Sequence, residues 1–410
     1  MNRRTLKGTV TLPGSKSESN RALMMAAYGG FPLEVEGLSD ANDTVLLKKL
    51  LSAASLRGAL ATKQSTVDCE DAGTVARFMM TYLAGRPGNW LLTGTERLCQ
   101  RPMAPLVDAL RQLGAGISAD HLPLRIEGHP LKGGAVTLDV SQSSQFASSL
   151  LMAAPTWEQG LQLTLKGNPV SMPYLEMTIK MLEYFGVQVI REGNAITVPH
   201  QSYKPRPFKV SADWSAASYW YEMLALSAGG GLLMKGLSQN TLQGDSKVAE
   251  LFKPLGINTE FTDNGVLITS KGSLPSNENP LEFDFINTPD LFPSILVTCV
   301  ALHIDSVFHG ISTLFNKESD RIHSLIAELK KYYTFINILD DDRLVIFKSS
   351  LSEDFINDRS LSFSTYDDHR LAMALAGLMV VFSDVKIDAP TVVNKSYPMF
   401  WHDLKNVLET

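Results

Sequence analysis

The chain has 410 residues, a formal net charge of −6 at pH 7 and 44% hydrophobic residues. This length predicts two domains of about 200 residues each. The negative net charge argues against a general affinity for nucleic acid or membrane surfaces, so a site for anions would have to be a local exception.

The first residues, MNRRTLKGTV, lack the apolar core of a signal peptide. The longest apolar runs, such as Met373–Phe382, reach about half the length of a membrane span. Cys69, Cys99 and Cys299 are far apart and show no metal-binding spacing. Together these features predict a cytoplasmic protein without structural disulfides or a zinc site.

Two helical patterns alternate along the chain. The first is a helix that begins with polar residues and continues with small and apolar ones on nearly all sides, which predicts burial. It occurs at Ser15–Ala27, Asp71–Gly85, Ser141–Pro155, Ala212–Gly229, Thr288–Leu302 and Tyr366–Val380.

The second pattern is an amphipathic helix that often ends in glycine and leads into an apolar strand. It occurs at Thr44–Leu56, Pro105–Ser118, Pro173–Ile190, Ser246–Phe261, Asp320–Leu339 and Met399–Glu409. The alternation gives a repeat of about 60 to 80 residues with two helices and a few strands. The sequence therefore predicts an α/β protein of two domains with three repeats each.

The entrance of the first buried helix, LPGSKSESNRAL (Leu12–Leu23), gathers Lys16, Arg21 and several serines. Backbone N–H groups and the positive end of the helix dipole make such a helix start suited to anions. The alternative is an ordinary N-cap formed by one serine. Because all six buried helices have polar entrances, the pattern favours several helix starts that share one anion site.

A series of motifs adds a family resemblance. They are PGSKSESNRAL, AGTVARF, RPMAPLVDALRQLGA, SSQFASSLLMAAP, PYLEMTIKMLEYFG, KESDRI, TYDDHRLAMA and NKSYP, in this order between Pro13 and Pro398. With them the chain resembles the 5-enolpyruvylshikimate-3-phosphate synthase (3-phosphoshikimate 1-carboxyvinyltransferase) family of enolpyruvyl transferases. The resemblance covers nearly the whole chain.

The resemblance implies two similar α/β domains, each of three βαβαββ repeats, with a substrate cleft between them. It places one domain at residues 13–212, which mainly bind shikimate phosphate. The other combines residues 1–12 with 213–410 and contributes much of the phosphoenolpyruvate binding.

The implied reaction moves the enolpyruvyl group of phosphoenolpyruvate to the 5-hydroxyl of shikimate 3-phosphate through a tetrahedral intermediate and releases phosphate. It belongs to the shikimate pathway to chorismate and aromatic amino acids, needs no metal or organic cofactor, and is the target of glyphosate. The two substrates bring roughly five to six negative charges. The motif-matched cations are Lys16, Arg21, Arg101, Lys317, Arg321, Arg370 and Lys395.

The resemblance also implies the binding residues. Shikimate 3-phosphate is expected at Lys16, Ser17, Arg21, Ser143, Ser144, Gln145, Ser171, Tyr174, Asp290 and Lys317. Phosphoenolpyruvate is expected at Lys16, Gly73, Arg101, Gln145, Arg321, Arg370 and Lys395. Without a Cβ, Gly73 would let the backbone approach a ligand, although an ordinary turn glycine is the alternative.

Three residues are implied in proton transfer. Asp290 is expected to accept the proton of the reacting hydroxyl, and Glu318 and Lys16 are the candidates for proton transfer at C3 of phosphoenolpyruvate. From the sequence alone, Asp290 could instead cap a helix, and Glu318 could be a salt-bridge partner of Arg321.

Three neighbouring residues are expected to support the site rather than react. Asp320 is expected to orient Arg321. Asp368 and His369 are expected to position Arg370 and cap its helix.

The chain departs from the usual family pattern at two positions, where Asp71 and Asp367 replace asparagine. A carboxylate about 6 Å from bound phosphoenolpyruvate would repel it by about 3 kcal/mol per charge pair at an effective dielectric of 20. These residues put substrate affinity in question more than the type of reaction. The small Gly73 is expected to leave room for glyphosate.

Two other functions were weighed. The sibling transferase that acts on UDP-N-acetylglucosamine carries a loop cysteine before an Arg-Pro pair, but Cys99 lies too close to Arg101-Pro102 for that loop. A catalytically silent anion-binding protein is kept open by Asp71, although the presence of both Asp290 and Glu318 argues against it. The protein is expected to act as a monomer on small-molecule substrates.

Overall fold

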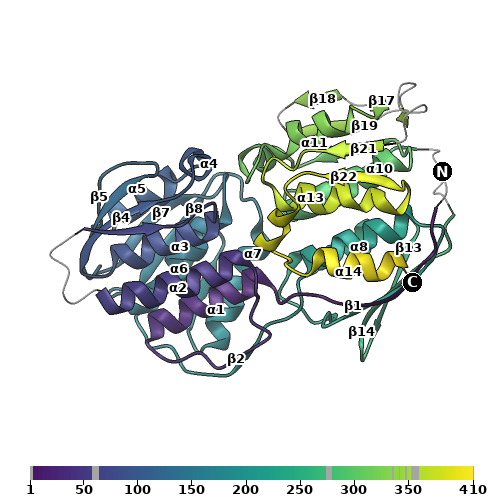
Figure 1. Cartoon of the computed structure of the whole chain (residues 1–410). Coiled ribbons are helices and arrows are strands. Elements are labelled where there is room, and N and C mark those ends of the chain that lie inside the picture. The colour runs from purple at the N-terminus through teal and green to yellow at the C-terminus, as the bar shows by residue number, and fades with distance from the viewer. Residues whose placement is uncertain are drawn as a thin grey trace. The chain divides into compact units, whose positions relative to one another are not determined.

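The computed structural model describes residues 3–57, 64–273, 279–334, 337–340, 342–346, 349–351 and 360–409. The chain divides into two compact units. We call Lys16–Val210 the continuous unit, and Met1–Ser15 together with Ser211–Thr410 the discontinuous unit. The described N-terminal strand lies beside the last helix of the chain, within the discontinuous unit (Figure 1).

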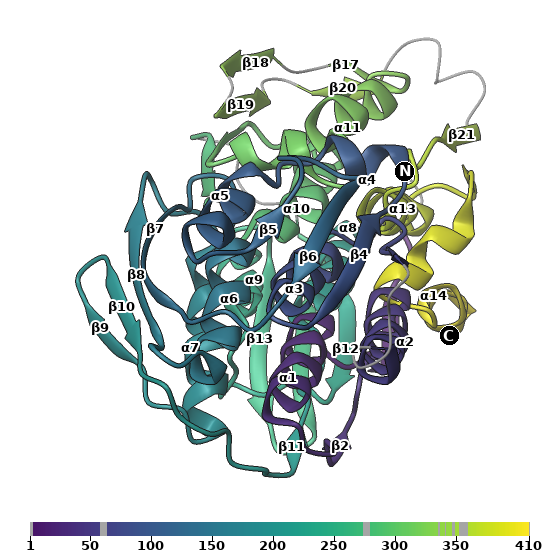
Figure 2. The ribbon, with the colours of Figure 1, turned by 90° about the vertical axis from the view of Figure 1, so that its left-hand side faces the viewer.

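The continuous unit contains two four-stranded sheets with the same topology and one shorter pair. In each four-stranded sheet the first two strands are parallel and the others antiparallel. One sheet has the order β3 (Ser65–Asp68), β4 (Gly88–Thr93), β6 (Leu124–Gly128), β5 (Gly116–Ile117). The other has the order β7 (Gly134–Asp139), β8 (Leu161–Lys166), β10 (Ala195–Val198), β9 (Ile190–Glu192), which can be followed in Figure 2. The shorter pair is β2 (Val35–Glu36) parallel to β11 (Phe208–Lys209).

Three buried helices of the continuous unit pack against one another. They are α1 (Lys16–Gly29), α3 (Gly73–Ala84) and α6 (Ser144–Ala153). The amphipathic helices α2 (Asn42–Arg57), α5 (Ala104–Gln112) and α7 (Met172–Tyr184) cover this trio, each contacting two of its members. The remaining helical segments are α4 (Glu96–Gln100) and the 3₁₀ turn η1 (Ala154–Thr156).

The discontinuous unit repeats this plan. Its four-stranded sheets are β1 (Leu6–Thr11), β12 (Gly230–Lys235), β14 (Gly265–Ser270), β13 (Ile257–Thr262), and β15 (Leu281–Asp284), β16 (Ser306–His309), β19 (Arg343–Ile346), β18 (Asn337–Asp340). Its two-stranded sheets are β21 (Ser360–Phe363) parallel to β22 (Asp384–Ile387), and β17 (Tyr333–Thr334) antiparallel to β20 (Ser350–Leu351).

The central trio of the discontinuous unit is α8 (Trp214–Leu226), α10 (Phe292–Ala301) and α13 (His369–Ala376), which contact one another. The other α-helices within the described residues of this unit are α9 (Val248–Leu251), α11 (Arg321–Leu329) and α14 (Phe400–Glu409). The 3₁₀ turns are η2 (Gly244–Lys247), η3 (Pro289–Leu291), η4 (Ser312–Asn316), η5 (Gly377–Val380) and η6 (Pro390–Lys395).

The predicted α/β fold with six repeats is confirmed. Each repeat contains one parallel strand pair. Among the described residues, the repeats of β2 with β11 and of β21 with β22 show this pair without further strands in the same sheet. Ser246–Phe261 was predicted as a helix that leads into a strand, and the strand is present as β13. The helix is shorter than predicted: only Val248–Leu251 is α-helical, because Pro254 has no N–H to donate to the carbonyl of Glu250.

Within the part of the chain that the structure describes, no helix has both the length and the apolar character to cross a membrane.

Candidate functional site

A network of charged side chains lies at the starts of three helical segments in the discontinuous unit. Arg321, the first residue of α11, is 1% exposed and donates from Nη1 to Asp290 Oδ1 at 3.0 Å. Its Nη2 donates to Glu318 Oε2 at 2.8 Å. Arg370, the second residue of α13, donates from Nη2 to the other oxygen of Asp290 at 2.7 Å. Asp290, at the start of the η3–α10 segment, is therefore shared by two arginines.

The environment of Asp290 favours its ionised form. Burial by itself raises the pKa of this carboxyl group. The charges of Arg370, Lys317 and Arg321 outweigh burial and hold the pKa below its ordinary value. Although burial opposes the charge of Arg321, its carboxylate partners raise the pKa of that guanidinium, so it stays protonated.

Asp368 contacts both arginines of the network. It is the N-cap of α13 and accepts from the backbone N–H of Arg370 at 2.9 Å. Its Oδ2 also accepts from Nε of Arg321 at 2.8 Å. The expected capping of the Arg370 helix is confirmed, but the side-chain partner of Asp368 is Arg321.

The expected role of Asp320 was wrong. Asp320 is the N-cap of α11 and accepts from the backbone N–H of His323 at 3.1 Å. Its other oxygen lies 2.8 Å from Nδ1 of His323. The carboxylates that hold the Arg321 guanidinium are those of Asp290, 31 residues earlier, of Asp368, 47 residues later, and of Glu318, three residues earlier.

Sequence reasoning missed Asp245 and Tyr219. Asp245 in η2 is buried and accepts a hydrogen bond from the hydroxyl of Ser215. Burial, followed by the nearby charge of Asp290, raises the pKa of Asp245 to about 7. The Tyr219 hydroxyl of α8 lies 3.4 Å from Nη1 of Arg370. The only sequence signal was the polar GDSK stretch at Gly244–Lys247.

Two further predicted cations belong to the same unit. Lys317 is half-buried directly before Glu318, and its charge reaches Asp290. Lys395 is the last residue of η6 and is 5% exposed, an unusual degree of burial for a lysine. Burial of a lysine is costly unless an anion or a polar group compensates its charge.

In the continuous unit, Arg21 joins three helices. Its Nε donates to Thr178 Oγ1 of α7 at 2.7 Å and its Nη2 to the Tyr174 carbonyl at 3.1 Å. Nη2 also lies 3.4 Å from Ser148 Oγ of α6, and Nη1 donates to the Ser17 carbonyl at 3.0 Å. Burial lowers the pKa of Arg21 to about 10, so the guanidinium remains charged at neutral pH. The structure thus brings Arg21, Ser17 and Tyr174 together.

A second group surrounds the start of α3. The N-cap residue of α3, Ala72, has no side-chain oxygen with which to accept from the backbone N–H groups of the first turn. A Cβ added to Gly73 would lie 2.6 Å from Nη1 of Arg101 and 2.7 Å from Nη1 of Arg77. Arg77 in turn donates to Gln145 Oε1 in the first turn of α6 at 2.9 Å. Two arginines therefore flank the helix start at Gly73, and Arg77 was not among the predicted binding residues.

The remaining predicted residues also lie at helix starts. Ser143 caps α6 by accepting from the backbone N–H of Gln145 at 3.2 Å, and the buried Ser144 follows it. Ser171 precedes α7 with a left-handed backbone (φ 54°) and makes no side-chain cap. A non-glycine residue in this conformation is strained, and such strain is common at functional sites.

Lys16 is the first residue of α1. Its Nζ lies 2.9 Å from Oδ2 of Asp43, a buried residue in the first turn of α2. Asp71 is half-buried two residues before Gly73, and Asp367 is exposed.

Taken unit by unit, the arrangement provides buried cations at helix starts, where backbone N–H groups and helix dipoles also favour anions. The discontinuous unit adds carboxylates among its cations, so it can transfer protons as well as bind anions. In the continuous unit, Arg21, Arg77 and Arg101 supply planar guanidinium groups suited to phosphate or carboxylate.

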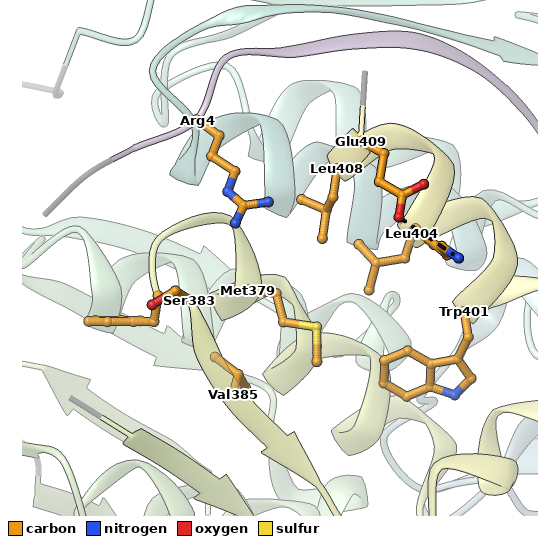
Figure 3. A pocket seen from close by; sticks show the side chains of 10 residues that line it. Arg4, Met379, Ser383, Val385, Trp401, Leu404, Leu408 and Glu409 are labelled. Atoms are coloured by element: carbon orange, nitrogen blue, oxygen red, sulfur yellow. Dashed lines mark ion pairs between the residues drawn. The ribbon is translucent and has the colours of Figure 1, made fainter. Parts of the chain in front are cut away.

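A separate surface pocket of about 340 Å³ lies in the discontinuous unit near α14. Figure 3 shows apolar side chains of α14 facing Met379, with Arg4 at one side. Its described lining includes none of the residues predicted for substrate binding. The pocket is therefore distinct from the charged groups described above.

Comparison with known proteins gives consistent matches. The sequence model of the family described as EPSP synthase (3-phosphoshikimate 1-carboxyvinyltransferase) matches residues 2–404. A 3-phosphoshikimate 1-carboxyvinyltransferase of Bacteroides fragilis is 39% identical over 406 residues, which is 98% of this chain and 95% of the relative. One from Vibrio cholerae is 32% identical over 420 residues, covering 97% and 96%. A solved EPSP synthase structure from Acinetobacter baumannii has a TM-score of 0.71 at 23% identity, covering 99% and 96%, and so shares the fold.

Proposed function

We propose, because the chain belongs to the EPSP synthase (3-phosphoshikimate 1-carboxyvinyltransferase) family, that it transfers the enolpyruvyl group of phosphoenolpyruvate to the 5-hydroxyl of shikimate 3-phosphate and releases phosphate. The observation that carries the proposal is Asp290 held between Arg321 and Arg370, a carboxylate kept ionised among cations that suit anionic substrates. The reaction serves the shikimate pathway to chorismate and the aromatic amino acids.

Each unit supplies part of the proposed binding set. In the continuous unit, Arg21 and the starts of α6 and α7 hold the phosphate of shikimate 3-phosphate, and Asp290 and Lys317 of the discontinuous unit bind its ring hydroxyls. Phosphoenolpyruvate is held by Lys16, Gly73, Arg101, Gln145, Arg321, Arg370 and Lys395. This assignment is supported by the burial of the arginines, because desolvated charges attract anions more strongly than exposed ones do.

The proposed chemistry proceeds by addition and elimination. The hydroxyl oxygen attacks C2 of phosphoenolpyruvate, and the electron pair of the C2–C3 double bond takes a proton at C3. The tetrahedral intermediate then loses a proton from C3, the double bond forms again, and the C2–O bond to phosphate breaks. The site must therefore accept the hydroxyl proton, deliver a proton to C3 and stabilise several negative charges.

Asp290 accepts the hydroxyl proton in this proposal. Its pKa is held low by Arg370, Lys317 and Arg321 against the effect of burial, which keeps it ionised but makes it a weak base. Anionic phosphoenolpyruvate bound to Arg321 and Arg370 would offset part of their charge. The basicity of Asp290 would then rise when the substrate is present.

Glu318 and Lys16 are the two candidates for proton transfer at C3. Glu318 is 13% exposed in its side chain and is ion-paired with Arg321, which places it beside a proposed phosphoenolpyruvate ligand. Lys16 begins α1 and is ion-paired with Asp43. Variants of Glu318 and of Lys16, each compared with the parent chain, would distinguish which residue transfers the proton at C3.

We place the enzyme in the cytoplasm, as a monomer acting on soluble metabolites. Cys69, Cys99 and Cys299, all among the described residues, are not in disulfide bonds. Free thiols support a reducing compartment.

The test is phosphate release by the purified chain given shikimate 3-phosphate and phosphoenolpyruvate, together and singly. We expect release only with both. Asp290→Asn keeps the size of the side chain but cannot accept a proton as a carboxylate does, so the rate should fall about 10²- to 10⁴-fold. The matched control is Asp384→Asn, an exposed carboxylate paired with Lys386, which should leave the rate unchanged.

Absence of phosphate release with both substrates would refute the proposed activity. If shikimate 3-phosphate then still bound tightly by calorimetry, the protein would be a silent anion-binding relative. In that case Asp71→Asn, which removes the carboxylate before Gly73, would be the first variant to examine for restored turnover.

A further inference from the structure

A strained turn leads into the network of Arg321 and Arg370. In Thr365–Asp368 the N–H of Asp368 donates to the carbonyl of Thr365 at 2.9 Å. The two central residues, Tyr366 (φ 52°) and Asp367 (φ 56°), both have left-handed backbones. Turns of this type favour glycine, asparagine and aspartate at these positions. Asp367 therefore fits the turn as asparagine would, whereas Tyr366 is strained by its left-handed backbone.

The end of this turn sets the position of two network residues. Asp368 is its last residue, caps α13 and holds Nε of Arg321. Arg370 lies two residues later in the first turn of α13. A change in the path of the turn would move the carboxylate of Asp368 and the start of the helix that carries Arg370.

Glu328 on α11 holds the segment that forms this turn. Its side chain is almost fully buried, with the residue 1% exposed. Oε2 accepts from the backbone N–H of Ser364 at 2.8 Å, and Oε1 accepts from the hydroxyl of Tyr366 at 2.9 Å. Between them, the N–H of Thr365 donates to Asp388 at 2.7 Å. Three successive residues are thus held by carboxylates.

Glu328 lies near the end of α11. The same helix begins with Arg321, which donates to Asp368 at the end of the turn Thr365–Asp368. About two helical turns later, Glu328 accepts from Ser364, just before that turn begins. Segment and helix are therefore joined at both ends. The strained Tyr366 is explained by this arrangement, because its left-handed backbone accompanies a hydroxyl bonded to Glu328.

We propose that Glu328 is a positioning residue for the reaction: by holding the turn Thr365–Asp368 against α11, it fixes Asp368 and Arg370 in the orientation that binds phosphoenolpyruvate. The inference rests on the proposed function, because Arg321 and Arg370 are the proposed ligands of that substrate. Glu328 acts through the turn and does not itself contact the substrate.

The kinetic test uses Glu328→Gln in the full chain. The variant keeps the side-chain volume but is uncharged and has only one acceptor oxygen. If that oxygen accepts from Ser364, the Tyr366 hydroxyl can only accept from the new amide, so both contacts with the turn lose the extra strength that the carboxylate charge gives them. We expect the KM for phosphoenolpyruvate to rise roughly tenfold or more, since small misplacements of binding groups cost up to about 100-fold. The KM for shikimate 3-phosphate should change less than about twofold, because its proposed phosphate ligands lie in the continuous unit. A purely structural defect would lower the amount of active enzyme and leave both KM values unchanged, which would overturn the proposal.

Two further variants accompany Glu328→Gln, one with a smaller expected effect and one as a control. Tyr366→Phe removes one hydroxyl from an exposed residue and is not expected to impair folding, so it serves if Glu328→Gln does not fold. It should raise the KM for phosphoenolpyruvate about two- to tenfold. Lys331→Ala removes the cation that follows α11 and pairs with Glu328, but leaves the bonds of Glu328 to the turn, and should change neither KM. An equal effect of Lys331→Ala would contradict the proposal.

A measurement without substrate separates this inference from the proposed function. Amide hydrogen exchange of residues 364–372 should be faster in Glu328→Gln than in the parent chain, and unchanged in Lys331→Ala. If the parent chain shows no turnover, the proposed function fails while exchange still tests the contact between Glu328 and the turn. Equal exchange in the parent and in Glu328→Gln would overturn the role of Glu328.

Discussion

At the scale of single residues, Gly73 shows how little space surrounds the proposed phosphoenolpyruvate ligands. A Cβ added at Gly73 would lie closer to the guanidinium groups of Arg101 and Arg77 than Cβ atoms lie to neighbouring atoms in real structures. Both obstacles are ends of flexible side chains, so an added methyl group would displace them and not disrupt the helix. Gly73 is thus explained by the guanidinium groups beside it and not by its backbone, which is not left-handed.

We therefore expect Gly73→Ala to fold normally and to raise the KM for phosphoenolpyruvate by about three- to thirtyfold, with a smaller effect on kcat, because displaced arginines bind the substrate less well. The measurement is initial rates at varied phosphoenolpyruvate. Gly85→Ala, at the other end of α3, is the matched control, since its Cβ would meet no atom closer than 3.9 Å. An unchanged KM in Gly73→Ala would show that Arg101 and Arg77 do not define this subsite.

At the scale of secondary-structure elements, α8 contains a carboxyl group that the proposed reaction does not use. Glu222 is fully buried, and neither of its oxygens has a hydrogen-bond partner in the described part of the chain. It packs against Gly377, where an added Cβ would lie 2.5 Å from Oε1. Burial raises the pKa of Glu222 well above its ordinary value, so the folded chain keeps this group protonated at pH values where the unfolded chain loses the proton.

The sign of the pH effect follows from this difference. Since the folded state binds more protons, the free energy of unfolding falls as pH rises above the ordinary pKa of a glutamate, by up to about 1.4 kcal/mol per pH unit. Glu222→Gln removes the titration, so its stability relative to the parent should increase from pH 5 to pH 9 in urea unfolding. Glu260→Gln, at an exposed position on β13, should show no such trend. A pH-independent difference between parent and Glu222→Gln would contradict the prediction.

The helices also show what the sequence could predict. The six buried helices were predicted because small and apolar residues follow a polar start on nearly all sides, and most amphipathic ones because each keeps its periodic pattern along its length. The shortened α9 was not, since Pro254 acts locally against an otherwise amphipathic pattern. The pair of Arg321 with Asp368 was also missed, because the two residues are 47 positions apart and periodicity carries no information on such contacts. The motifs predicted which residues bind substrate, and the sequence offered Arg77 only as a cation that could offset the charge of Asp71. The supporting residues Asp245 and Glu328 became visible only in the structure.

At the scale of the whole molecule, the protein is acidic while its proposed substrates are anions. With a net charge of −6, the overall field repels the substrates, and binding has to come from the buried cations at helix starts. The repulsion by the overall field and the attraction by the buried cations respond differently to changes of surface charge. A change of net charge acts over the whole surface and is screened over about 10 Å at 0.1 M salt, whereas contacts within the site act at short range.

We expect the KM for phosphoenolpyruvate to rise several-fold between 0.1 M and 1 M potassium chloride, where the screening length falls from about 10 Å to about 3 Å, with a smaller change in kcat. A variant with Lys209→Glu and Lys386→Glu makes the net charge more negative at exposed positions that pair with Glu36 and Asp384 and not with predicted site residues. Its KM at each salt concentration should match that of the parent, because the local cations determine binding. A KM above that of the parent at 0.1 M salt that converges with the parent value at 1 M would show instead that the field of the whole surface controls access of the substrates to the site.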